Sequence, residues 1–286
     1  MNDGSDIQLS NEFLSKYPFK IEYYLNEHLG VSATRNACLG HAIADYIMFC
    51  DADDIFFSAC GIYNILREII KGDFDYLVSD FLEETILPTE DKSHAYLVRE
   101  ANSIFVHGKV YRKQFLLDCN IKWNPQLTIH EDSYFNILCN LLSTNTKTIN
   151  MPFYCWRWRE TSVCRKDPLY SIKTFINLID SNKALINSLL DRNKIDYAKI
   201  YVADMVYKTY FTLNKQEWLN PINQELKNNT EIHFKKYWEK YKIFFNTTPQ
   251  EEKNQIIKKL KIKSFDEQMF LESITFEDWI KHIESL

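Results

Sequence analysis

The hydrophobic pattern in the first part of the chain predicts helices that alternate with strands. Residues 30–45 are typical of a helix, and the apolar residues 46–50 after it predict a strand. A second amphipathic helix is expected over 58–71, ended by Gly72, and a second strand over 74–80. Helix, strand, helix and strand in this order favour parallel pairing through crossovers, which indicates an α/β fold.

Further segments extend this pattern toward residue 165. Residues 103–112 are apolar and lead into a short helix over 112–120. A longer helix is predicted over 131–142, where acidic residues at its start suit a helix N-terminus. Residues 151–158 are aromatic and strand-like. These segments add helices and a strand to the expected α/β unit.

The character of the sequence changes after this unit. From residue 168 the chain consists of Lys- and Asn-rich amphipathic helices with aromatic residues on their apolar sides. We therefore place a boundary between Arg165 and Pro168, which gives an α/β domain over 1–165 and a helical C-terminal subdomain over 166–286. A chain of 286 residues is long enough for one core with a smaller helical annex.

Composition and charge exclude several classes of protein. Hydrophobic residues make up 45% and charged residues 26%, as in ordinary globular proteins. The net charge of −5 leaves no basic excess to cover phosphates, which argues against a nucleic-acid-binding protein. The seven cysteines are odd in number and form no C-x-x-C pair, so we expect buried free thiols. No uninterrupted apolar segment is long enough to cross a bilayer and the N-terminus has no signal-peptide pattern, so the expected location is the cytoplasm.

Three acids follow directly after the strand 46–50. They are Asp51, Asp53 and Asp54, and ligands in α/β proteins usually bind at such strand ends. Carboxylate oxygens in this arrangement suit a hard divalent cation, whereas the other interpretation is a solvated turn. An EF-hand is excluded because Phe56 stands where that loop needs glycine, and no matching Glu ligand follows.

Several local patterns occur in one order and together resemble those of the family 2 glycosyltransferases. They are Asn2-Asp3-Gly4-Ser5, the helix start Gly30-Val31-Ser32-Ala33-Thr34-Arg35-Asn36, and Phe49-Cys50-Asp51-Ala52-Asp53-Asp54. The later His130-Glu131-Asp132 resembles the acidic pair of that family, and Gly108-Lys109-Val110-Tyr111-Arg112 resembles an element of its bacterial lipopolysaccharide and capsule branches. The resemblance covers residues 1 to about 165 and implies a GT-A-like fold, a mixed sheet flanked by helices.

This resemblance implies a metal-dependent donor site on the acidic run. Asp53 and Asp54 would hold Mn²⁺ or Mg²⁺, which offsets the negative charge on the leaving diphosphate. Asp51 would lie near the ribose or the water shell of the metal, and Ala52 would border the nucleotide sugar.

Two residues upstream are implied to contact the nucleotide. Asp3 would accept a hydrogen bond from the uracil edge, and Arg35 would lie close to the nucleotide. Each has an alternative role from its local sequence. Asp3 is also typical of a turn, and Arg35 would suit a surface ion pair with Asp45 or Glu27.

Asp132 is the candidate general base, since an inverting transfer needs a carboxylate to take the proton of the acceptor hydroxyl. Glu131 and His130 would orient Asp132 or contact the acceptor. The alternative is that these acids only stabilise the helix dipole. His107 and Lys109 would either contact the acceptor or border the sheet.

The aromatic segment 154–165 resembles the closing segment of the family, in which basic groups reach the diphosphate. Guanidinium groups match phosphate geometry, which makes candidates of Arg157, Arg159 and Arg165. The alternation of Trp and Arg is equally typical of a half-buried edge strand.

The C-terminal helices combine aromatic and basic residues, among them Trp238, Tyr241, Lys240 and Lys242. A basic amphipathic helix can lie on an anionic membrane, so one expectation is peripheral association at the inner face of the cell membrane. The other expectation is that these side chains pack onto the catalytic domain or a homodimer partner.

The start of the chain departs from the family pattern. Family members have a strand, a helix and a strand before the N-D-G-S turn, whereas residues 7–29 predict one helix near 11–16 and one strand near 19–25. Three explanations compete: an upstream start codon, a partner chain that supplies the missing strands, and a decayed copy of an enzyme.

The sequence therefore predicts a metal-dependent inverting glycosyltransferase of polysaccharide biosynthesis. It would move a hexose or N-acetylhexosamine from a nucleotide-sugar donor, UDP-linked, to a glycan or lipid-linked glycan acceptor. The main alternative is an inactive glycosyltransferase-fold relic or subunit that acts in binding or assembly. A metal-dependent phosphotransferase or nuclease is a third reading of the acidic run.

Overall fold

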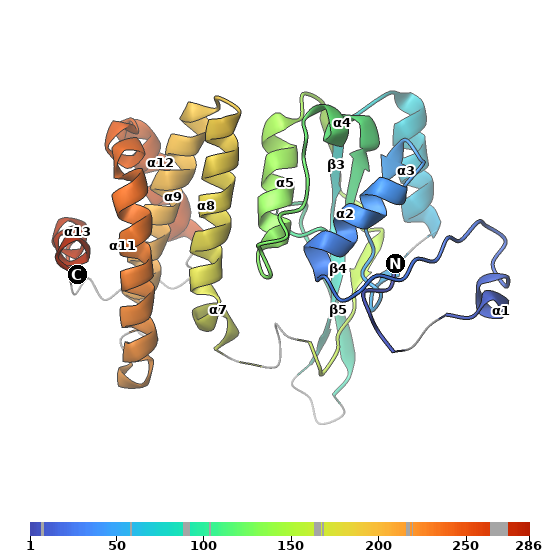
Figure 1. Cartoon of the computed structure of the whole chain (residues 1–286), viewed down its shortest axis with the longest axis horizontal. Helices are drawn as coiled ribbons and strands as arrows, with labels where there is room; N and C mark the ends of the chain where they lie inside the picture. Colours follow the sequence, from blue (N-terminus) through green and yellow to red (C-terminus); the bar gives the residue numbers. More distant parts are fainter. Residues whose placement is uncertain are drawn as a thin grey trace. The chain divides into compact units, whose positions relative to one another are not determined.

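A computed structural model gives the fold (Figure 1) and describes residues 1–6, 9–57, 59–87, 92–102, 104–162, 167, 169–215, 218, 220–263 and 274–286. The chain divides into two compact units, residues 1–162 and 163–286. The predicted boundary residues Arg165 and Pro168 lie outside the described residues. Each unit is described by itself.

The first unit is built on a four-stranded sheet of order β1-β6-β3-β7. β1 (Tyr46–Ile47) and β3 (Tyr76–Ser79) both pair antiparallel with β6 (Lys109–Arg112), and β7 (Thr146–Ile149) pairs parallel with β3. The predicted α/β class, a mixed sheet flanked by helices, is confirmed. The expectation that strands 46–50 and 74–80 are parallel neighbours is wrong, because β6 lies between them and pairs with both.

A second four-stranded sheet has the order β2-β8-β4-β5. β4 (Phe81–Ile86) and β5 (His94–Arg99) form an antiparallel pair at the bottom of Figure 1. β8 (Tyr154–Trp156) pairs parallel with β4 and antiparallel with β2 (Ile55–Phe56). The sheet therefore brings the aromatic segment around residue 154 against the end of the acidic run.

Helices cover both faces of the first sheet. Leu77 of β3 and Val110 of β6 pack in one core cluster with Ile65 of α3 (Ala59–Lys71). Their neighbours Tyr76 and Tyr111 point the other way, because residues alternate along a strand, and both donate to Asn136 of α5 (Glu131–Leu142). The first unit also contains α1 (Asn11–Leu14), α2 (Val31–His41) and α4 (Lys113–Asp118).

Two sequence predictions for this unit need correction. The strand near 19–25 does not form, and the segment has only an isolated bridge between Asn2 and Leu25. No disulfide joins the described cysteines, but they are not uniformly buried: Cys139 and Cys155 are buried, whereas Cys50 and Cys60 are exposed.

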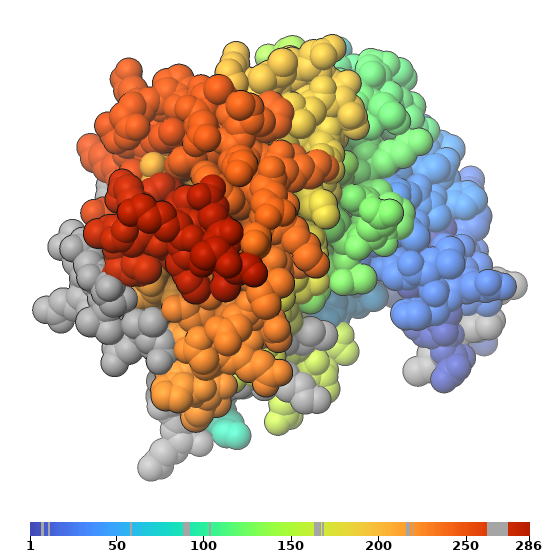
Figure 2. All heavy atoms as spheres, turned by 60° about the vertical axis from the view of Figure 1, so that its left-hand side comes forward, coloured from blue at the N-terminus to red at the C-terminus, as the bar shows by residue number. Residues whose placement is uncertain are grey.

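The second unit is helical. Its elements are α7 (Tyr170–Lys173), α8 (Phe175–Asp191), α9 (Ile195–Leu213), η1 (Pro221–Asn223), α11 (Gln224–Thr247), α12 (Gln250–Lys263) and α13 (Phe276–Ser285). α9 packs against α8, α11 and α12, and Figure 2 shows α13 on the surface of α11. The aromatic side of α11 faces this core, since Trp238, Tyr241 and Phe245 are buried. Among the described helices, none is long and apolar enough to cross a membrane.

Candidate functional site

The acidic run 51–54 forms a tight turn between β1 and β2. The Asp54 N–H donates to the Asp51 carbonyl over 3.0 Å, which closes the turn. Because β2 pairs with β8, the Tyr154 hydroxyl reaches the run, donating to Asp54 Oδ2 over 2.5 Å and accepting from the Asp51 N–H over 3.2 Å. The Arg157 N–H donates to Asp54 Oδ1 over 2.9 Å. The orientation of the Asp54 carboxylate is thus fixed by two donors.

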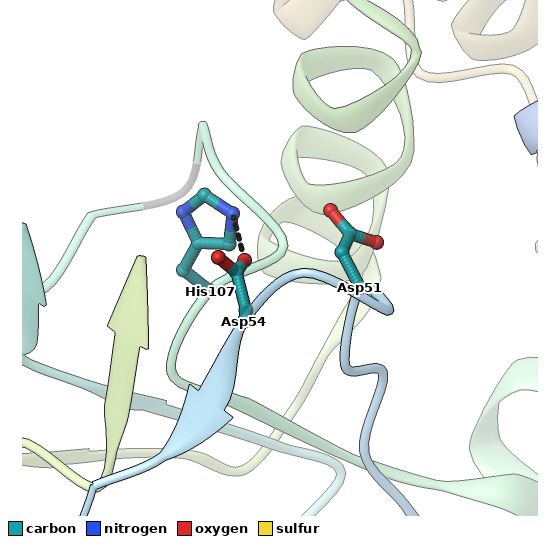
Figure 3. Close-up of side chains that lie close together, drawn as sticks. All are labelled: Asp51, Asp54 and His107. Carbon is teal, nitrogen blue, oxygen red and sulfur yellow. Dashed lines mark ion pairs between the residues drawn. The ribbon is translucent and has the colours of Figure 1, made fainter. Parts of the chain in front are cut away.

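His107 faces Asp54 from the loop before β6, with Nε2 3.7 Å from Asp54 Oδ2 (Figure 3). Its imidazole stacks on Tyr154 at 4.9 Å and on Phe105 at 5.8 Å, measured between ring centroids. Burial lowers the pKa of His107 to about 4, so the ring is neutral at pH 7. Its buried Nδ1 finds no hydrogen-bond partner in the described part of the chain.

These side chains fit a divalent cation. Asp51, Asp54 and His107 each offer one ligand atom, and these atoms lie within 4.8 Å of one another. Carboxylate oxygens suit Mg²⁺ and Mn²⁺, and a histidine must be neutral to bind a metal, as His107 is. Burial, followed by the charges of Asp51 and Asp53, raises the pKa of Asp54 to about 6. A bound cation would stabilise the ionised form of Asp54 instead.

Asp53 is directed elsewhere. Its Oδ2 accepts from Arg159 Nη1 over 2.8 Å, and both side chains are about half exposed. Ala52 is exposed at the tip of the turn. Of the two predicted metal ligands, the cluster therefore contains Asp54 but not Asp53, and it adds Asp51 and His107. The only sequence signal for His107 was a histidine within the apolar stretch 103–112.

Arg35 connects the acidic run to the acids at the start of α5. Its Nη2 donates to Asp51 Oδ1 over 2.9 Å, and its Nη1 donates to Asp132 Oδ1 over 2.6 Å and to Glu131 Oε1 over 3.3 Å. The guanidinium carbon lies 4.5 Å from the ring centroid of Trp123. Arg35 is only 6% exposed. The surface ion pair with Asp45 or Glu27 that the local sequence allowed is therefore wrong.

Glu131 and Asp132 lie at the N-terminus of α5. Their position follows from His130, whose left-handed backbone conformation with φ of 62° precedes the helix. Asp132 Oδ2 accepts from the Val106 N–H over 3.0 Å, while its other oxygen accepts from Arg35. Burial and then the neighbouring Asp132 charge raise the pKa of Glu131. Glu131 and Asp132 are therefore two adjacent carboxyl groups that Arg35 connects to Asp51 of the candidate cation site.

Asp3 lies beside the start of α2. Its two carboxylate oxygens accept from the N–H groups of Leu29 and Gly30, each over 2.9 Å. Desolvation alone would raise the pKa of Asp3, but these backbone donors lower it. Gly30, with a φ of 86°, is the N-cap residue of α2, so Asp3 holds the segment that leads into this helix.

The remaining basic candidates are in different surroundings. Lys109 is 1% exposed and donates to the His107 carbonyl over 2.8 Å, so it is buried within the sheet. Burial lowers the pKa of Lys109 to about 7. The Arg157 Nε lies 3.7 Å from Glu84 Oε2, and Arg165 lies outside the described residues.

Comparisons with known proteins agree with this fold. The family model described as "Glycosyl transferase family 2" matches residues 1–155. Among solved structures, S. aureus TarS 1-349 is similar with a TM-score of 0.56 and 12% identity, over 96% of this chain and 88% of that chain. No curated protein matches.

Two of the similar structures hold ligands. TarS 1-349 in complex with UDP has a TM-score of 0.54 at 13% identity, over 96% of this chain and 88% of that one. The complex with UDP-GlcNAc has a TM-score of 0.53 at 13% identity, over 88% of this chain and 79% of that one. Against the longer TarS chain, this protein spans 37% of the length.

Proposed function

The chain belongs to glycosyl transferase family 2, since the family model matches more than half of it, and we propose that it transfers a sugar from a nucleotide-sugar donor to a glycan acceptor. The observation that carries this proposal is the cluster of Asp51, Asp54 and His107 linked through one arginine to the acids of α5. It combines a candidate site for a diphosphate-bound cation with a candidate base.

The donor side of the reaction is assigned to the acidic turn. Asp51, Asp54 and His107 would hold Mn²⁺ or Mg²⁺, which when bound compensates the charge of the leaving diphosphate. Arg159 pairs with Asp53, and both side chains are about half exposed. Both residues remain proposed contacts of the nucleotide sugar, together with Ala52. This assignment replaces the sequence-based metal pair with a set of three side chains.

The acceptor side is assigned to α5. Asp132 takes the proton of the acceptor hydroxyl while that oxygen forms the new bond to the anomeric carbon. The bond to the diphosphate breaks on the opposite face, so the anomeric configuration inverts. The proton ends on Asp132. Glu131 lies beside Asp132 as a second acid, and burial raises the pKa of Glu131.

A UDP-linked hexose or N-acetylhexosamine is the proposed donor, and a glycan or lipid-linked glycan the proposed acceptor. The UDP and UDP-GlcNAc complexes of structures with the same fold support the donor class. Cytoplasmic location with peripheral attachment to the membrane belongs to the same proposal. The catalytic domain would span 1–165 and the helical subdomain 166–286.

A homodimer or a partner chain that adds a strand to the first sheet is also proposed. β1 is an edge strand of that sheet and is paired only with β6 in the described chain. A groove of about 390 Å³ runs beside it, lined in part by His41, Ile43 and Tyr46. Such an edge is a template for strand addition.

Thermal unfolding with UDP, with and without Mn²⁺, separates the transferase from a binding or assembly protein. We expect a metal-dependent rise in melting temperature, because a ligand stabilises the state that it binds. Asp54→Asn should abolish the rise, while Asp118→Asn, at an exposed position of α4 outside the cluster, is the matched control and should keep it. A protein that melts cooperatively without any shift would favour the inactive relic, and cleavage of nucleic acid would favour the nuclease. UDP release from UDP-sugars then tests turnover.

A further inference from the structure

Arg35 contacts acids from two separate parts of the candidate site, Asp51 and Asp132. We propose that Arg35 is a positioning residue that holds Asp51 of the cation cluster and Asp132 of α5 in one fixed arrangement. The inference rests on the proposed function, because it assigns the two acids to the two sides of one transfer. The sequence-based expectation that this arginine contacts the nucleotide is the alternative that the kinetic experiment below tests.

The geometry supports a linking role. The acids that Arg35 contacts are distant in sequence, since Asp51 is 16 residues away and Glu131 and Asp132 are 96 and 97 residues away. One planar guanidinium spans both groups by using different nitrogens, Nη2 for Asp51 and Nη1 for the acids of α5. A fixed fork of donors sets both the distance and the relative orientation of the carboxylates that it binds.

Arg35 is itself held in place. Its guanidinium lies over the Trp123 ring at 4.5 Å, and that ring stacks on Phe135 of α5 with centroids 4.1 Å apart. The backbone of Trp123 is bound to Asn36 by two hydrogen bonds, of 2.9 Å and 2.8 Å. The Arg35 side chain is 8% exposed. It is therefore part of the core between α2 and α5 and not a mobile surface group.

The charge of Arg35 and the geometry of its donors can be separated by substitution. One guanidinium contacts three carboxyl groups through two nitrogens. A lysine would preserve the charge but presents its donors on a single nitrogen, and it cannot bind both sides in a fixed geometry. Arg35→Lys therefore separates positioning from charge.

Binding of Mn²⁺ to the protein alone tests the cation side, by isothermal titration calorimetry. We expect Arg35→Lys to weaken Mn²⁺ binding about tenfold, because groups that orient metal ligands typically affect affinity by roughly 10- to 100-fold. In an Asp51→Asn background the same change should have no further effect. Arg99→Lys alters the exposed pair with Glu83, outside the cluster, and is the matched control. Unchanged or tighter Mn²⁺ binding by Arg35→Lys would overturn the inference.

Steady-state release of UDP from UDP-GlcNAc tests the acceptor side. A positioning role predicts that Arg35→Lys lowers kcat about 100-fold while KM for the donor changes less than about threefold. A direct nucleotide contact would instead raise KM and spare kcat, which would refute the proposal. If the unaltered protein releases no UDP, the proposed function fails, and the Mn²⁺ titration still decides the role of Arg35.

A second variant covers the case in which Arg35→Lys fails to fold. Asp132→Asn removes one acid from Arg35 without altering a cation ligand. The arginine would then bind Asp51 more strongly, so Mn²⁺ binding should weaken by about threefold. Mn²⁺ affinity equal to that of the unaltered protein would show that the two sides are not linked.

Discussion

Lowering the pH from about 7 to about 5 should weaken cation binding to the cluster of Asp51, Asp54 and His107. Burial raises the pKa of Asp54 to about 6, so half of the molecules carry a protonated Asp54 at pH 6. A cation needs the ionised carboxylate, and its binding therefore releases a proton below this pH. The apparent affinity should fall about tenfold between pH 7 and pH 5, because each pH unit below the pKa costs a factor of about ten. His107 does not add to this loss, because burial lowers its pKa to about 4.

Calorimetric titration of Mn²⁺ at pH 5, 6, 7 and 8 measures this dependence. The heat should also differ between buffers of different ionisation enthalpy at pH 5.5, since a proton is released there. Asp118→Asn is the control and should keep the pH profile, because Asp118 is exposed on α4 and lies outside the cluster. Asp54→Asn should bind weakly and without the change between pH 5 and 7. A constant affinity of the unaltered protein over this range would refute the reasoning.

Two further predictions concern the parts of the fold that support the site. Asp3→Ala removes the acceptor of the Leu29 and Gly30 N–H groups just before α2 and should lower the free energy of unfolding by about 1 kcal/mol in a urea titration. No loss would mean that water replaces the carboxylate. Asn136→Ala leaves the buried hydroxyls of Tyr76 and Tyr111 without their acceptor and should cost about 2–4 kcal/mol. A cost under about 1 kcal/mol would show that the two hydroxyls find other partners.

The sequence predicted the elements in which buried residues repeat at regular spacing along the whole element. α5 begins and ends as expected, because its buried residues repeat at helical spacing from Ser133 to Cys139. The hairpin of β4 and β5 was not predicted. β5 is exposed at almost every position and shows no alternation, and β4 carries Glu84, which is only 4% exposed. His94 and the Trp158 N–H satisfy that carboxylate, and such compensation by distant residues is invisible in a local pattern.

β6 shows the same difficulty within the first sheet. Lys109 is 1% exposed, although a lysine in a short apolar stretch normally indicates a surface position. Its ammonium group donates to the His107 carbonyl, a contact that depends on the turn at Gly108, where φ is 67°. The strand was therefore not assigned from the sequence. As a result, strands 46–50 and 74–80 were expected to pair with each other, whereas β6 lies between them.

The candidate site was predictable where its residues are adjacent in sequence and not where the fold assembles them. Asp51 and Asp54 share one turn, so the acidic run was evident from the strand before it. The roles of Arg35 and His107 depend on partners from other elements: Arg35 binds Asp132, 97 residues away, and His107 faces Asp54 in the turn before β2. The sequence shows which residue types are present. Which oxygen each side chain contacts depends on the pairing of β2 with β8 and on the position of α2 beside the start of α5.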